Sequence, residues 1–113
     1  MFEQKNRLRH EKDVKLTLKK GRSVFDSVCG VKFRPNGGTD SRFAVVVGIK
    51  VHKSAVKRNR VRRQYREIIR TNLTGIKPGM DVMLLTSKGA LDLDYDAKKE
   101  RLMGVLKKAK LVV

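Results

Sequence analysis

The side chains of this sequence best suited to chemistry are the cations concentrated in residues 53–70. Drawn as a helix at about 100° per residue, the segment places Asn59, Arg63, Arg66 and Arg70 on one stripe. The neighbouring arc is apolar and consists of Val61, Tyr65, Ile68, Ile69 and Leu73. Arginine carries a planar fork that suits bidentate contact with phosphate. The pattern predicts a helix that packs on one face and binds a nucleic acid with the next.

Most charge runs in proteins are solvated faces, but the sign of this one argues against that interpretation. Only Glu67 offsets the cations of the segment, so their mutual repulsion opposes the helix unless a polyanion is present. Arg58 and Arg62 project close to the apolar arc, which a fully docked helix would not tolerate without buried partners. We therefore expect the second half of the helix to sit on a core and the first half to protrude.

Hydrolytic chemistry would require a metal-binding cluster or a general base beside the scissile phosphate. Asp92, Asp94 and Asp96 lie close together, but the start of a helix explains them better, with one of them as N-cap. His10 and His52 are far apart and have no neighbouring nucleophile or acid. His52 either hydrogen-bonds a phosphate or is a surface histidine without a role. The residues predict that this chain is not catalytic on its own.

The segment Ala55–Arg63 resembles the arginine-asparagine-arginine signature of the protein subunit of bacterial ribonuclease P. Asn6-Arg7-Leu8 resembles the opening of that family, and Asp13–Gly21 has the spacing of its first helix. The resemblance implies a small protein that binds a large catalytic RNA and the 5′ leader of precursor tRNA, and that assists magnesium-dependent 5′ maturation. The Mg²⁺ ions would belong to the RNA subunit, no cofactor would be bound by the protein, and no protein partner is implied.

Candidate site residues follow from the cationic segment and from the resemblance. The candidates for RNA binding are Arg7, Arg9, Lys50, Lys53, Lys57, Arg58, Asn59, Arg60, Arg62, Arg63, Arg66 and Arg70. Asn59 either hydrogen-bonds a sugar or phosphate or caps a local turn. The resemblance places the leader in a cleft between the first helix and the sheet, where the candidates are Val14, Leu18 and Lys32. The family usually carries two phenylalanines where this chain has Val14 and Leu18, so these two either line the cleft without stacking or belong to the core.

The composition bounds the class of protein. A chain of 113 residues needs one core, so we expect one domain with a loosely held basic arm at residues 1–9. The formal net charge of +17 favours association with polyanions. No apolar run is long enough to span a bilayer or to form a signal peptide, and the single cysteine, Cys29, allows no intrachain disulfide. We expect a cytoplasmic location and no membrane partner.

Two other classes of protein fit part of the pattern. A ribosomal or other structural-RNA-binding protein would also be small, basic and rich in arginine, although the arginine-asparagine-arginine spacing argues against it. A DNA-binding protein fits less well, because no helix-turn-helix or dimerising heptad is visible.

The remaining elements must position the cationic helix. The pattern over 10–20 fits two structures, since Val14, Leu16 and Leu18 alternate as in a strand, whereas Val14 and Leu18 also share a helical face. The resemblance favours a helix there, with Gly21 as C-cap. Over 22–33 we expect a strand or bent strand pair with a bulge at Gly30. The turn residues at 34–40 predict a hairpin tip. The run at 42–51 is apolar on both faces and predicts a central strand.

After the cationic helix, which Ser54 would cap, we expect a strand over 81–86, a turn over 88–90 and a last helix capped by Asp94. This order, α-β-β-α-β-α, predicts an α/β fold of the α+β sandwich type, with a mixed sheet packed by helices. The two strands that flank the cationic helix would be parallel. General rules predict a right-handed crossover there, whereas the resemblance implies a left-handed one, which we adopt.

Overall fold

The computed structural model describes residues 3–112. Within these residues the helices are α1 (Glu11–Lys20), α2 (Ala55–Thr71) and α3 (Tyr95–Lys108), and the strands are β1 (Arg22–Phe25), β2 (Cys29–Pro35), β3 (Arg42–Val46) and β4 (Met80–Thr86). Short 3-10 helices lie at Gln4–Asn6, Leu73–Gly75 and Lys88–Ala90. The expected α/β class with a mixed sheet is confirmed. The segment 22–33 forms two strands, so the order contains one strand more than α-β-β-α-β-α.

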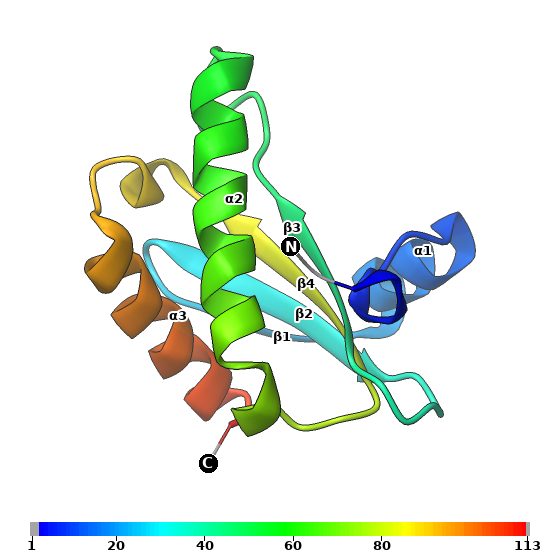
Figure 1. Cartoon of the computed structure of the whole chain (residues 1–113). Helices are drawn as coiled ribbons and strands as arrows, with labels where there is room; N and C mark the ends of the chain where they lie inside the picture. The colour runs from blue at the N-terminus through cyan, green and yellow to red at the C-terminus, as the bar shows by residue number, and fades with distance from the viewer. Residues whose placement is uncertain (1–2, 113) are drawn as a thin grey trace.

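The sheet has the order β1-β2-β4-β3, with β4 antiparallel to β2 and parallel to β3. Helices α2 and α3 cover one face of the sheet, and α1 lies against the other (Figure 1). The core fills the space between the sheet and the α2–α3 layer. Its largest fully buried apolar side chains include Val31, Tyr65, Ile68, Val82, Leu84, Leu102 and Leu106.

Strand β3 is an edge strand, so the prediction of a central strand over 42–51 is wrong. The strand ends at Val46, and the chain from Val47 to Ser54 leads to α2 without further pairing in the sheet. The central strand beside it is β4, which enters between β2 and β3. The apolar residues of β3 serve two surfaces: Phe43 and Val45 lie in the core, whereas Val46 on the other face is 38% exposed.

The loop after β2 is not a hairpin tip, because β2 and β3 are separated by β4. The hairpin joins β1 to β2, and its turn is built by Asp26, whose Oδ1 accepts from the backbone N–H groups of Val28 (2.7 Å) and Cys29 (2.8 Å). The expected bulge at Gly30 is also wrong, because Gly30 pairs in regular register with Phe25 and Leu85.

The amino-terminal segment is held by the sheet instead of forming a loose arm. Asn6 is buried, and its Nδ2 donates to the carbonyl of Ser41 at 2.8 Å. Leu8 is also buried, and its N–H donates to the carbonyl of Phe43 at 3.0 Å. The segment therefore covers the β3 edge of the sheet. An uncovered edge strand would present unpaired backbone N–H and C=O groups to other chains. Residues 1–2 of the expected arm lie outside the described residues.

The connection from β3 through α2 to β4 is left-handed. In Figure 1, α2 lies in front of the sheet, both arrows point upward, and β4 lies to the left of β3. Nearly all such crossovers in proteins are right-handed. The expectation taken from the resemblance therefore holds here against the general rule.

The helix ends follow the sequence closely. Ser54 is the N-cap of α2 and accepts from the N–H of Lys57 at 3.4 Å, and Asp94 caps α3 by accepting from the N–H of Ala97 at 2.8 Å. Gly21 follows α1 with an extended backbone (φ −70°). A Cβ at Gly21 would lie 2.3 Å from the carbonyl oxygen of Thr17, so close approach of the backbone is the reason for this glycine.

Candidate nucleic-acid interface

Helix α2 is anchored along one side only. Val61, Tyr65, Ile68 and Ile69 are buried, whereas Val56 in its first turn is 76% exposed. Figure 1 shows the amino-terminal turns of α2 extending past the ends of the strands. The prediction that only the second half of the helix sits on the core is confirmed. The free first half presents cations on more than one side.

Arg58 holds the chain that enters α2. Its Nη1 donates to the carbonyl oxygens of His52 at 2.9 Å and Lys53 at 2.8 Å. The Nδ1 of His52 in turn accepts from the N–H of Ser54 at 2.9 Å. These bonds give Arg58 and His52 a structural role in fixing the turn before the helix, a role that the sequence did not reveal.

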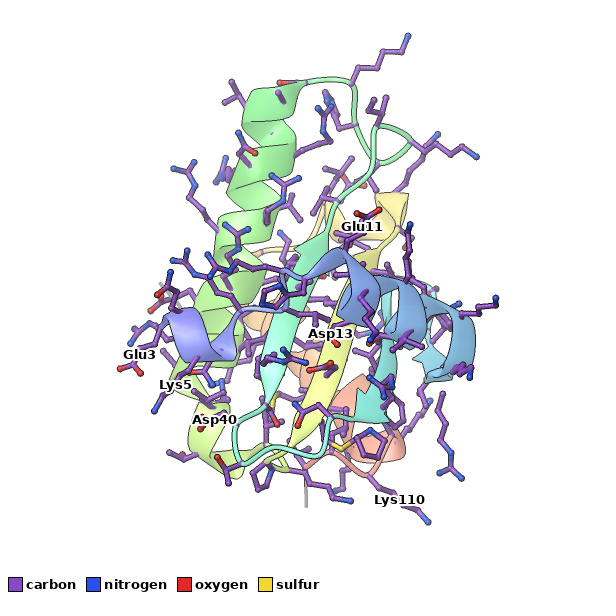
Figure 2. All side chains as sticks on the ribbon, turned by 90° about the vertical axis from the view of Figure 1, so that its right-hand side faces the viewer. Glu3, Lys5, Glu11, Asp13, Asp40 and Lys110 are labelled. Atoms are coloured by element: carbon purple, nitrogen blue, oxygen red, sulfur yellow. The ribbon has the colours of Figure 1, made fainter. Side chains whose placement is uncertain are left out.

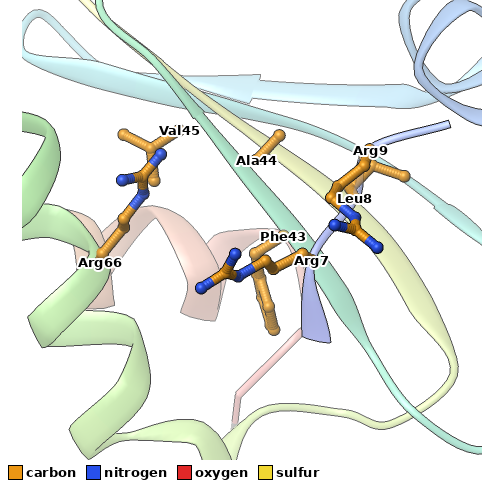
Figure 3. A pocket seen from close by; sticks show the side chains of 7 residues that line it. All are labelled: Arg7, Leu8, Arg9, Phe43, Ala44, Val45 and Arg66. Atoms are coloured by element: carbon orange, nitrogen blue, oxygen red, sulfur yellow. The ribbon is translucent and has the colours of Figure 1, made fainter. Parts of the chain in front are cut away.

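The guanidinium groups of Arg7 and Arg66 point into one cavity of about 250 Å³ between α2 and the amino-terminal segment (Figure 3). Its lining residues are Arg7, Leu8, Arg9, Phe43, Ala44, Val45 and Arg66. Burial together with the charges of Arg62 and Arg7 lowers the pKa of Arg66. The side chains of Arg7, Arg9 and Arg66 bring three cations to the lining of this one cavity.

We name Arg7, Arg9, Asn59, Arg62, Arg63 and Arg66 the arm–α2 surface. Among residues 3–112, no carboxylate lies within ion-pair distance of its arginines. Asn59 uses its Oδ1 to accept a hydrogen bond from Nη1 of Arg62. The contact fixes the direction of that guanidinium group on the exposed side of the helix. The surface is cationic, partly preorganised and open to an anion.

The flank of α2 that faces α3 has a different composition. A cavity of about 500 Å³ there brings Lys57 and Arg60 together with Asp92, Asp94 and the buried Lys98. The Nζ of Lys98 donates to the carbonyl of Leu93. Burial and the charge of Arg60 lower the pKa of Lys98, and Asp94 partly opposes them. We name Lys57, Arg60, Asp92, Asp94 and Lys98 the α3 flank; it mixes both signs of charge.

The other predicted RNA-binding residues are more scattered. Lys50 and Lys53 are exposed in the segment that leads into α2. Arg70 is bound by Glu67 of its own helix, with Nε and Oε2 3.0 Å apart, so its charge is compensated. The expected continuous stripe from Asn59 to Arg70 is thus reduced at its carboxyl end.

The three leader candidates lie where α1 meets the sheet. Val14 is half-buried and Leu18 is 38% exposed, and neither belongs to the core cluster between the sheet and α2. The Nζ of Lys32 donates to the carbonyl of Leu18 at 3.1 Å, which ties β2 to the end of α1.

A buried ion pair lies under α1. Asp81 is fully buried and accepts two hydrogen bonds of 2.7 Å from Arg42, whose Nη1 is also 3.2 Å from Asp13 of α1. In Figure 2, Asp13 lies at the edge of α1, over the strands of the sheet. This ion pair was not foreseen, because its members are spread over three elements and follow no local pattern. It fixes α1 on its face of the sheet.

The described part of the chain contains no cluster of three or more His, Cys, Asp or Glu side chains that could hold a metal ion. Asp94 is occupied as the α3 N-cap, as expected. Within residues 3–112, no helix is both long and apolar enough to cross a membrane.

Comparison with known proteins agrees with this geometry. A family model described as Ribonuclease P matches residues 2–110. The ribonuclease P protein component of Thermotoga maritima is 34% identical over 111 residues, which cover 95% of this chain and 94% of the relative. The solved structure of the Staphylococcus aureus RNase P protein gives a TM-score of 0.87 at 27% identity, covering 96% of this chain and 98% of that chain.

The solved Thermotoga maritima RNase P protein gives a TM-score of 0.82 at 34% identity, covering 90% of this chain and 96% of that chain. The match thus extends over the amino-terminal segment, the sheet and the cationic helix together. This chain belongs to the ribonuclease P protein family, the accessory protein subunit of an endoribonuclease of tRNA processing.

Proposed function

We propose that this protein binds the catalytic RNA subunit of ribonuclease P through the arm–α2 surface and the 5′ leader of precursor tRNA on the α1 face of the sheet. The observation that supports RNA binding most strongly is the convergence of Arg7 and Arg66, from distant parts of the chain, on one cavity without a carboxylate partner among residues 3–112. Uncompensated, partly buried guanidinium groups are costly unless an anion meets them.

The protein's contribution is electrostatic and positional. RNA and precursor tRNA are both polyanions that repel one another, and a chain of net charge +17 reduces that repulsion where the two meet. Arg62 and Arg66 would contact phosphates, with Asn59 orienting the first of them. Val14, Leu18 and Lys32 would lie along the path of the leader. The resulting gain is tighter substrate binding at a given concentration of magnesium.

The proposal assigns the Mg²⁺ ions to the RNA subunit, where they would activate water and stabilise the leaving oxygen. The chain's own residues would act by holding phosphates. A ribosomal role is set aside because the chain belongs to a different family. A cytoplasmic site of action is part of the proposal, since tRNA maturation requires access to newly made precursor tRNA.

Reconstitution tests the proposal. The protein, the catalytic RNA and their mixture would each be incubated with precursor tRNA over a range of Mg²⁺ concentrations, and kcat and KM for 5′ cleavage measured. We expect the protein to lower KM and the magnesium requirement, and we expect protein freed of RNA to be inactive. Robust 5′ cleavage by the protein alone would overturn the division of labour, and a mixture no better than RNA alone would overturn the binding role.

A further inference from the structure

One row of residues crosses all four strands on the α1 face of the sheet. Phe25 of β1 pairs with Gly30 of β2, Gly30 with Leu85 of β4, and Leu85 with Val46 of β3. Side chains two positions further along these strands include Lys32, which bonds to α1, so the row shares the face that α1 occupies. We name Phe25, Gly30, Leu85 and Val46 the cross-strand row.

The cross-strand row exposes apolar surface on an otherwise charged molecule. Phe25 is 51% exposed and Val46 is 38% exposed, as is Leu18 at the near end of α1. A single exposed apolar side chain is ordinary, but Phe25 and Val46 are joined across the sheet by Gly30 and Leu85 on the same face. Aligned exposed apolar side chains of this kind mark an interaction surface.

The ring of Phe25 is held in place by the glycine opposite it. A Cβ at Gly30 would lie 1.8 Å from Cδ1 of Phe25 and 2.5 Å from Cγ, so the ring occupies the space that any other residue at position 30 would fill. The ring therefore rests on the backbone of β2 while half of the side chain stays accessible. Glycine at position 30 thus has a reason other than the bulge that the sequence suggested.

The surroundings favour an RNA base as the occupant. Lys32 lies one row away on the same face, and α1 adds the exposed Lys12 and Lys19, whereas Lys15 is paired with Glu11 at 2.9 Å. An apolar protein segment would gain nothing from these cations. A single-stranded nucleotide would use both features, because its base stacks on an aromatic ring and its phosphate is attracted to nearby lysines.

We propose that Phe25 is the residue on which a base of the 5′ leader stacks. This inference rests on the proposed function, in which the leader crosses the α1 face. It moves the stacking contact from the first helix, where this chain has Val14 and Leu18, to the edge strand β1. The cross-strand row then forms a floor on which the base lies, with Leu85 and Val46 continuing it across the sheet.

The test is a double-mutant cycle between the protein and the leader, carried out with the reconstituted holoenzyme. Phe25→Leu keeps an apolar side chain over Gly30 but removes the aromatic face. Precursor tRNA is prepared with abasic sites placed one at a time along the leader, and mature tRNA without a leader gives the baseline. We expect Phe25→Leu to reduce the leader-dependent part of the affinity about fivefold or more. The loss should be non-additive with an abasic site at one leader position.

Two further variants sharpen the result. Phe25→Trp would introduce the only tryptophan of the chain, and its emission should be quenched by a precursor tRNA with a leader but not by mature tRNA. Ile49→Ala, which removes a 70% exposed side chain outside the row, should leave the leader-dependent affinity unchanged.

If leader-dependent affinity is present but shows no coupling to Phe25, this inference fails and the proposed function stands. If the wild-type holoenzyme shows no leader-dependent affinity, the proposed leader contact fails as well. Circular dichroism of Phe25→Leu is the control for folding. An unchanged spectrum would show that a loss of affinity does not come from loss of the sheet.

Discussion

The two flanks of α2 carry cations of the same kind but differ in what surrounds them. On the arm–α2 surface, Arg62 and Arg66 lie near Arg7, and no carboxylate among residues 3–112 is within ion-pair distance of these three side chains. On the α3 flank, Lys57 and Arg60 share their surroundings with Asp92 and Asp94. The comparison suggests a rule that can be tested: the tertiary neighbours that leave cations unneutralised, and not only the number of cations on a helix, should decide where RNA binds.

The largest effect should come from removing both converging arginines. Arg7→Ala combined with Arg66→Ala should weaken binding of the catalytic RNA by tenfold or more, since a hydrogen bond to a charged group contributes about 1.5–3 kcal/mol. The slope of log K against log salt should fall by roughly 0.7–1 for each lost phosphate contact. A salt titration of RNA binding measures both. Arg70→Ala is the matched control, because Glu67 already neutralises Arg70, and an equal loss in that variant would contradict the comparison.

A smaller loss should follow from releasing the segment that carries Arg7. Asn6→Ala removes the buried hydrogen bond to Ser41 and should destabilise the fold by about 1–3 kcal/mol. RNA affinity should fall as well, because Arg7 and Arg9 would no longer be held beside α2. Denaturant unfolding and RNA binding at low denaturant separate the two effects. Unchanged affinity would show that the position of the arm does not matter for binding.

On the α3 flank, Arg60→Ala should weaken RNA binding by less than about fivefold, because the acids of that flank already offset part of the charge. Asp92→Asn should act in the opposite direction and steepen the salt dependence slightly. If Arg60→Ala lowered RNA affinity more than Arg66→Ala in the same assay, the α3 flank and not the arm–α2 surface would be the main RNA contact.

The smallest effect concerns stability and pH. Lys98→Met removes a buried ammonium group and its bond to Leu93, and near neutral pH the two changes should cancel to within about 1 kcal/mol. The folded pKa of Lys98 is lowered, so the unfolded chain binds more protons and wild-type stability rises with pH between that pKa and 10.5. Lys98→Met should lack this rise. The free energy of unfolding of both proteins, measured from pH 8 upward, tests this difference. If it changed with pH equally in the wild type and in Lys98→Met, Lys98 would not be the source of the rise.

The elements that sequence predicted well are those with local signals. The helix caps at Ser54 and Asp94 and the buried face of α2 depend on residues within a few positions of one another. The prediction of strand order failed because strand order is a long-range property. Nothing within residues 42–51 reveals that β4, more than thirty residues after β3, lies between β2 and β3. The turn at Asp26 did carry a local signal, an aspartate beside a serine, that was overlooked.

The candidate site was predictable only in part, for the same reason. The cations of α2 are visible in the sequence, but their division into two flanks depends on contacts with residues 6–9 and 91–98. Arg58 was predicted to bind RNA, and the structure adds hydrogen bonds from it to the preceding loop that no helical pattern reveals. The resemblance to a family supplied the handedness of the crossover, which the general rule would have given wrongly.

The place of β4 in the sheet also bears on when, during synthesis, the arm–α2 surface can be assembled. Among the strands of residues 3–112, β3 pairs only with β4, and the amino-terminal segment docks on its other edge. A nascent chain that has emerged through α2 therefore holds all the cations of the arm–α2 surface but no sheet to bring them together. Only when residues 80–86 leave the ribosome can β3 be fixed and Arg7 be set beside Arg66. On the proposed function, we therefore expect high-affinity RNA binding only after most of the chain has been made.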